Sequence, residues 1–154
     1  MQTINQTAPV SSARLSRMLC FAIYSASHAF TRVYKPLLDR VGLTYPQYLV
    51  LLVLCEEDNL TVKQIGERLF LDSGTLTPLL KRLEAAGFLR RARDGQNERQ
   101  VRVTLTSKGR AIEEQAASIM SELFCAIGQP EERVLALTEE VARLRAALVH
   151  HSSR

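Results

Sequence analysis

The sequence predicts a mainly α-helical fold with one small β-hairpin, on three observations. Two helical patterns joined by a tight turn occupy residues 61–86, and two short strands with alternating apolar residues follow at 88–106. Long amphipathic stretches lie on both sides of this segment. Together they predict a winged helix-turn-helix domain, flanked by N- and C-terminal dimerisation helices, in a chain of 154 residues that is 46% apolar and so can bury a core.

The helix pair has recognisable start and stop signals. The first helix is predicted to begin at Thr61, because Gln64 three residues later completes a capping box. Asp72 or Ser73 then caps the second helix, and Gly87 ends it in the left-handed conformation that suits a residue without Cβ. The inner face of the second helix repeats leucine at helical spacing: Leu76, Leu79, Leu80 and Leu83.

The outer face of the second helix is polar and rich in hydroxyl groups near its N-terminal end. Free backbone N–H groups and the helix dipole favour phosphate oxygens there, as a helix that enters the major groove of double-stranded DNA requires. A solvated face on an ordinary helical hairpin is the simpler alternative. The residues predicted to contact DNA from this helix are Ser73, Thr75, Thr77, Lys81 and Arg82.

Positive charge is concentrated in and around the predicted hairpin. Residues 81–110 hold nine Lys or Arg against three acids, a net charge of +6, whereas the whole chain carries +4. A basic hairpin beside a helix-turn-helix is the electrostatic pattern of a wing that lies along the DNA backbone. Arg91, Arg93 and Arg99 are the predicted wing contacts, and Arg99 is the candidate for a tip that enters the minor groove.

The flanking segments complete the predicted organisation. Residues 1–12 are predicted to form a flexible tail, and 13–154 a single domain with its winged helix-turn-helix at about 44–107. Dimerisation helices are expected at about 13–40 and 107–149, with Gly128-Gln129-Pro130 interrupting the second.

Two details of these helices are predicted from single residues. Pro36 should kink or end the first long helix. Thr44 should cap a helix that runs to about Glu57, and because its apolar residues surround the axis, we expect it to be the central buried helix.

The last helix favours a homodimer. Two long amphipathic arms exceed what a wing domain of roughly 50 residues needs to cover its own core, although one larger monomeric core is the alternative reading. Symmetric readout of a pseudo-palindromic operator needs two recognition helices about one helical turn of DNA apart. The apolar stripe of this helix comprises Val134, Leu137, Val141, Leu144 and Leu148.

Composition argues against several other classes. No secretory segment is apparent, and the longest strongly apolar run, 48–55, is too short to span a bilayer, so we expect a cytoplasmic protein without a membrane partner. The three cysteines and three histidines lack metal-ligand spacing, so neither a metal nor another cofactor is predicted. No phosphate loop, carboxylate pair or nucleophile–histidine arrangement indicates an enzyme. Cys55 is expected to be an inert core thiol.

Three segments resemble the MarR family of winged-helix repressors, and within it the organic-hydroperoxide sensors of the OhrR type. They are LCFAIYSASHAFTRVYKPLLDRVGLTYPQYLVLLVL, IGERLFLDSGTLTPLLKRLEAAG and NERQVRVTLTSKGR, and the resemblance covers roughly residues 15–148. It implies a peroxide-reactive thiol at Cys20, two thiolate-stabilising phenols at Tyr34 and Tyr45, and a resolving thiol at Cys125 that forms an intersubunit disulfide.

The wing departs from the family pattern at one position. The family usually has Asp-x-Arg there, with the acid paired to the arginine, whereas this chain reads Asn97-Glu98-Arg99. Asn carries no charge, so Asp94 or Glu98 is expected to orient Arg99 instead.

Three functions compete at this stage. The first is a repressor that leaves DNA when an organic hydroperoxide oxidises Cys20. The second is a repressor of the same fold released by a small phenolic or antibiotic ligand. The third, from another class, is a thiol peroxidase, which a basic wing does not favour.

Overall fold

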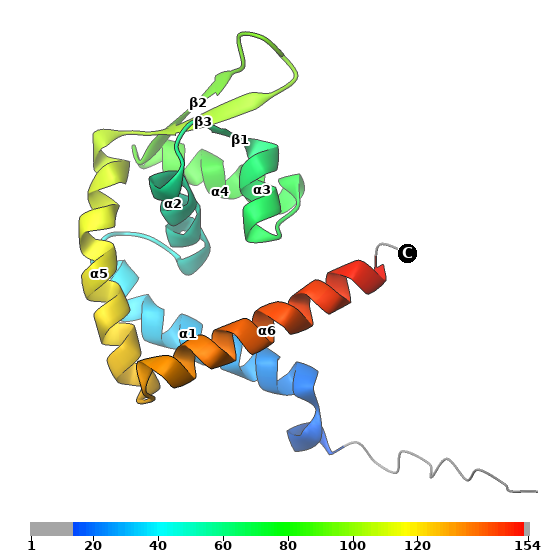
Figure 1. The fold of residues 1–154 in the computed structure, drawn as a ribbon. Coiled ribbons are helices and arrows are strands. Elements are labelled where there is room, and N and C mark those ends of the chain that lie inside the picture. Colours follow the sequence, from blue (N-terminus) through cyan, green and yellow to red (C-terminus); the bar gives the residue numbers. More distant parts are fainter. Residues whose placement is uncertain (1–13, 153–154) are drawn as a thin grey trace, which may run out of the picture.

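The computed structural model describes residues 14–152, and the tail predicted at residues 1–12 lies outside them. Six α-helices and three short strands are described, which confirms the mainly helical fold with a small β wing. In Figure 1 the strands and helices α2 to α4 form one end of the molecule, α1 and α6 form the other, and α5 runs along one side from the strands to α6. The elements are η1 (Leu15–Arg17), α1 (Leu19–Asp39), α2 (Tyr45–Glu56), β1 (Leu60–Thr61), α3 (Val62–Leu69), α4 (Ser73–Ala85), β2 (Leu89–Arg93), β3 (Val101–Leu105), α5 (Ser107–Ile127) and α6 (Glu131–Ser152).

Local capping sets the starts of the helices, as the sequence predicts. The Thr61 backbone N–H donates to Gln64 Oε1 at 2.8 Å, and the Gln64 N–H donates back to Thr61 Oγ1 at 3.2 Å. Asp72 caps α4 by accepting the Thr75 N–H at 2.8 Å. Thr106 caps α5 in the same way, through the Gly109 N–H. Each such cap stabilises its helix by about 1 kcal/mol.

Helix ends agree less closely with the sequence predictions. Gly87 follows α4 with φ of +81°, as predicted, but α1 continues past Pro36 to Asp39, so the proline does not end the helix. Phe70 ends α3 in the left-handed conformation, φ +56°, which is uncommon for a residue with a Cβ. The turn after it is tight, since a Cβ added at Gly66 would lie 2.6 Å from the Leu71 carbonyl oxygen.

Helix α2 is the central buried helix, as its all-round apolar pattern predicts. Tyr48, Val50, Leu51 and Leu54 are each at most 1% exposed. Leucines of α4 complete this core, but Leu79 is only half-buried, which corrects its assignment to the fully buried inner face. The α4 leucines that are fully buried are Leu76, Leu80 and Leu83.

The sheet has three antiparallel strands in the order β1-β3-β2. The two wing strands pair in the register Leu89↔Leu105 and Arg91↔Val103. Strand β1 pairs with the other edge of β3 and is absent from the sequence prediction, because two residues are too few to show an alternating pattern.

Helix α6 has no buried residue within the single chain. The apolar side chains of Val141 and Leu148, which belong to the predicted stripe, are 49% and 61% exposed. An exposed apolar stripe of this length indicates a surface that another copy of the chain can cover. Within the described residues, no helix combines the length and apolarity that crossing a bilayer requires.

Alanine substitution of α4 leucines should lower stability more at a fully buried position than at a half-buried one. Leu80→Ala leaves a cavity in a fully buried site and should lower the free energy of unfolding by about 2 to 5 kcal/mol. Leu79→Ala, the matched control, should cost clearly less because part of its side chain already meets solvent. Urea titrations followed by circular dichroism measure both, and equal losses would contradict the burial described for α4.

Candidate nucleic-acid interface and thiol site

The N-terminal end of α4 presents hydroxyl groups beside its cap. Both the backbone N–H and the hydroxyl of Thr75 donate to the Asp72 carboxylate, at 2.8 and 3.1 Å, and these bonds hold the pKa of Asp72 below its ordinary value. Ser73 and Thr75 are exposed at this end, while Thr77 is half-buried. Lys81 and Arg82 are exposed further along the same helix.

Ion pairs hold the wing in shape. Asp94 accepts the Gln96 backbone N–H at 2.9 Å and the Arg102 Nε–H at 2.6 Å, and these bonds lower its pKa. Arg102 also donates to the Asn59 carbonyl oxygen at 2.8 Å, which ties the wing to the loop before β1. Asp94 therefore orients Arg102, whereas the sequence suggested Asp94 or Glu98 as the acid that orients Arg99.

Arg99 is held through its backbone alone. Its N–H donates to Asn97 Oδ1 at 3.2 Å, so the Asn that replaces the usual acid shapes the turn. The Arg99 side chain is exposed and takes part in no ion pair within residues 14–152. The Arg99 guanidinium can therefore contact a DNA phosphate or enter the minor groove.

Arg91, one of the predicted DNA contacts, is paired with an acid of the same domain. Its backbone N–H and its Nε donate to Glu84 at 2.9 Å each, and its Nη2 donates at 2.7 Å. These contacts lower the pKa of Glu84 and fix β2 on α4, so Arg91 serves the wing base. Exposed cations of α4 and the wing that form no ion pair within the described residues are Lys81, Arg82, Arg90, Arg93 and Arg99.

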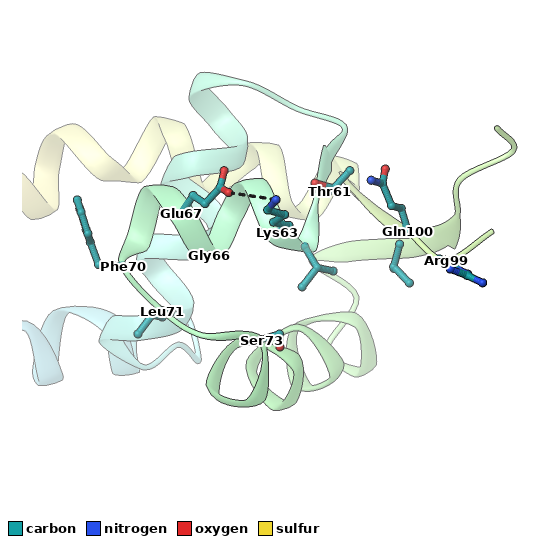
Figure 2. Close-up of a pocket in the computed structure, with 11 residues that line it drawn as sticks. Thr61, Lys63, Gly66, Glu67, Phe70, Leu71, Ser73, Arg99 and Gln100 are labelled. Carbon is teal, nitrogen blue, oxygen red and sulfur yellow. Dashed lines mark ion pairs between the residues drawn. The ribbon is translucent and has the colours of Figure 1, made fainter. Parts of the chain in front are cut away.

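An open cleft of about 650 Å³ lies between α3, the start of α4 and the strand that follows the wing tip. Figure 2 shows Ser73 at the start of α4 across from Lys63 on α3, with Arg99 and Gln100 to one side of both. Lys63 pairs only loosely with Glu67, at 3.8 Å and with both side chains exposed. Lys63 and Gln100 are not among the contacts that the sequence predicts, because only the folded chain brings α3 beside the wing.

The cysteines differ in their surroundings. Cys20 is the second residue of α1 and is exposed, and Cys125 is exposed near the end of α5. Cys55 is half-buried in α2, where burial first and Glu113 second raise the pKa of its thiol, as expected of an unreactive cysteine. All three are free thiols.

Tyr34 and Tyr45 lie together, with ring centroids 4.5 Å apart. Burial, then the neighbouring Tyr45 and Tyr48, raise the pKa of Tyr34 to about 12, and burial also raises that of Tyr45. Both phenols therefore stay protonated at neutral pH and can donate hydrogen bonds.

The two phenols cannot reach Cys20 of their own chain. Cys20 and Tyr34 are fourteen residues apart on one continuous helix, which separates them by about 21 Å at 1.5 Å per residue. Their predicted role at the thiolate therefore requires the tyrosines of a second subunit.

Cys125 lies in the part of α5 that packs on the middle of α1. Helix α5 packs on α1 around a groove of about 240 Å³ whose lining includes Phe30, Val33 and Ile127. Cys20 lies outside this groove, six residues or about 9 Å along the helix before Ala26, the lining residue nearest to it in the sequence.

The chain is similar in sequence to known transcriptional regulators. A family model described as Transcriptional regulator SarA/Rot matches residues 32–115, more than half of the chain. HTH-type transcriptional regulator TtmR from Methylorubrum extorquens is 51% identical over 145 residues, covering 94% of this chain and 74% of the relative. The Organic hydroperoxide resistance transcriptional regulator of Bacillus subtilis is 51% identical over 106 residues, covering 69% and 72%.

Solved structures agree with the sequence matches. Reduced AbfR bound to DNA has a TM-score of 0.71 and 38% identity, covering 88% of this chain and 94% of AbfR. AbfR, a protein of Staphylococcus epidermidis, has also been solved with its disulfide formed; that structure has a TM-score of 0.58 and 37% identity, covering 92% and 94%.

The fold and these matches define a winged-helix transcriptional regulator rather than an enzyme, as predicted. More specifically, the chain belongs to the SarA/Rot family of transcriptional regulators, which has the MarR-type winged helix, so the predicted resemblance is confirmed.

The Glu84–Arg91 contact should make the wing base sensitive to acid. Because its folded-state pKa lies below the ordinary 4.5, Glu84 contributes stability that is present above that value and is lost as the pH falls through the folded-state pKa. Glu84→Gln should therefore lower the thermal unfolding midpoint at pH 7 by a few degrees, with little difference from wild type near pH 3. Thermal melts from pH 7 to pH 3 measure this, and a difference that persists unchanged at pH 3 would rule out the ion pair as its source.

Proposed function

We propose that the chain is a homodimeric repressor that binds a pseudo-palindromic operator in double-stranded DNA and leaves it when an organic hydroperoxide oxidises Cys20. The observation that carries the DNA-binding part is the set of exposed cations on α4 and the wing that form no ion pair within residues 14–152, beside an open cleft that Arg99 lines. The relative named for organic hydroperoxide resistance and the DNA-bound AbfR structure support both halves of the proposal.

The cleft fits a DNA strand. When α4 lies in the major groove and the wing tip in the adjacent minor groove, the sugar–phosphate strand between those grooves must pass between the two elements. Lys63 and Gln100 line that path together with Ser73 and Arg99. We therefore add Lys63 and Gln100 to the proposed contacts and keep Ser73, Thr75, Thr77, Lys81, Arg82, Arg93 and Arg99.

Two features support a dimer in which the thiol site is shared. The apolar side chains of α6 are exposed in the single chain, so a second copy can bury them. The separation of Cys20 from Tyr34 along α1 requires that the partner subunit supply the phenols. Phenol O–H groups that donate to a thiolate stabilise its charge and lower the pKa of the thiol.

The proposed chemistry has two steps. The Cys20 thiolate attacks the outer oxygen of the hydroperoxide, so that the O–O bond breaks, the sulfur becomes a sulfenic acid and the alkoxide takes up a proton to leave as an alcohol. The thiol of the partner subunit's Cys125 then attacks that sulfur, which forms a disulfide and releases water. The bond requires Cα atoms within about 7 Å, so the arms must move from an arrangement that holds the two thiols further apart.

Substitutions around the cleft should change DNA affinity in a salt-dependent way. Removing one phosphate contact, by Lys63→Ala or Arg99→Ala, should weaken binding to every operator variant and reduce the slope of log affinity against log salt by about one. Arg143→Ala, which removes the same charge from an exposed position on α6, is the matched control and should leave the slope unchanged. Fluorescence anisotropy between 50 and 200 mM salt measures the slope, and an unchanged slope for Arg99→Ala would count against the wing contact.

The cysteine variants test the switch. After cumene hydroperoxide, non-reducing gels of wild type should show a disulfide-linked dimer, and gel shifts should show loss of operator binding. Cys20→Ser or Cys125→Ser should abolish the dimer band, whereas Cys55→Ser should retain it because that thiol is half-buried in α2. A Cys20→Ser variant that still leaves DNA on peroxide treatment would refute the proposal, because the release would then not depend on this thiol.

A further inference from the structure

Tyr48 has a hydroxyl group that its own fold does not use. The residue is 1% exposed, and within residues 14–152 its hydroxyl is the one enclosed side-chain polar atom without a hydrogen-bond partner. A buried hydroxyl without a partner destabilises a protein, and phenylalanine fills the same space without that cost. The hydroxyl therefore needs a reason outside the packing of the single chain.

Its neighbours are the two phenols of the proposed thiol site. The Tyr48 ring lies 6.1 Å from the Tyr34 ring, which itself lies 4.5 Å from the Tyr45 ring, so Tyr34 is the middle member of the three. Burial, followed by Tyr45 and then Cys55, raises the pKa of Tyr48, and the hydroxyl is a protonated donor at neutral pH.

We propose that Tyr48 is a positioning residue for the redox thiol, and that its buried O–H donates to the Tyr34 oxygen when Tyr34 turns its own O–H toward the partner subunit's Cys20. This inference rests on the proposed function, because it requires a thiolate delivered by a second subunit. Tyr34 has one O–H to donate, and its oxygen can still accept a hydrogen bond while that O–H points at sulfur.

The consequence is a stronger donor at the sulfur. A hydroxyl whose oxygen accepts a hydrogen bond is polarised and donates more strongly, so a chain from Tyr48 through Tyr34 to the thiolate stabilises the charge more than Tyr34 alone. Tyr48 itself is enclosed and does not touch the sulfur; it acts only through Tyr34. Loss of the Tyr48 hydroxyl should therefore raise the pKa of Cys20 without changing the DNA-binding surface.

The test compares Tyr48→Phe, Tyr34→Phe and the double variant in the full-length dimer with Cys55→Ser and Cys125→Ser, so that Cys20 is the only thiol. The rate of alkylation by iodoacetamide between pH 5 and 9 gives the pKa of Cys20, and stopped-flow mixing with cumene hydroperoxide gives its oxidation rate. Tyr48→Phe should raise the pKa and slow oxidation at pH 7 by roughly 3- to 10-fold, since one pKa unit is tenfold. Operator affinity of the reduced protein should stay unchanged.

The double variant tells whether Tyr48 acts on the thiol through Tyr34 or affects it independently, through packing. If Tyr48 acts through Tyr34, Tyr48→Phe has no further effect on the thiol in the Tyr34→Phe background; full additivity overturns the relay. A Tyr48→Phe variant with wild-type thiol pKa and oxidation rate, whether more or less thermally stable, also overturns it. If Tyr34→Phe and Tyr45→Phe also leave the thiol unchanged, the shared thiol site itself fails, which distinguishes failure of the proposed function from failure of this inference.

Discussion

The continuity of α1 is the constraint on which the proposed redox chemistry depends. A 21-residue helix uninterrupted by Pro36 holds Cys20 at one end and Tyr34 about four turns away, and no side-chain rotation can close that distance. The same stiffness that keeps the phenols from their own thiol makes them available to another subunit. In the proposed sensor, a single subunit does not hold a complete thiol site. The dimer arms are therefore part of the proposed redox chemistry, in addition to joining the two DNA-binding domains.

The basic residues fall into two groups, one paired with acids of the fold and the other available to bind DNA. Arg91 and Arg102 are engaged by Glu84 and Asp94, and Arg110 pairs with Asp58, whose carboxylate also accepts the Leu105 N–H at 2.9 Å. Arg91 fixes β2 on α4, Arg102 braces the wing and ties it to the loop before β1, and Arg110 joins α5 to that loop. The cations of α4 and the wing tip that form no ion pair within the described residues are therefore held on a rigid support. Binding phosphate with a rigid wing costs less conformational entropy than binding it with a flexible hairpin.

The sequence predicted features that arise from neighbouring residues and missed those that need the folded chain. Three features depend only on residues a few positions apart and were predicted from them: the Thr61–Gln64 capping box, the Asp72 cap and the turn at Gly87. Leu79 has the same helical spacing as the buried leucines, yet α4 leaves it half-exposed because burial depends on which elements pack against each side of the helix. For the same reason the sequence did not predict the pairing of Arg91 with Glu84, which spans α4 and β2, or the position of Lys63 on α3 beside the wing.

Helix α5 links the two halves of the molecule mechanically. At its start, Thr106 Oγ1 donates to the Gly87 carbonyl oxygen at 2.6 Å, and Lys108 Nζ donates to the Ala86 carbonyl oxygen at 2.8 Å while lying 4.2 Å from the centre of the Phe88 ring. Gly109 sits so close to the Phe88 carbonyl that an added Cβ would lie 2.1 Å from it. The start of α5, the end of α4 and the base of the wing therefore move together. Cys125 lies near the other end of this 21-residue helix, which is about 31 Å long. In the proposed switch, a disulfide that displaces Cys125 moves one end of α5 while the other end stays packed against α4 and the base of the wing. Movement of the arms is thereby passed to the proposed DNA-binding helix.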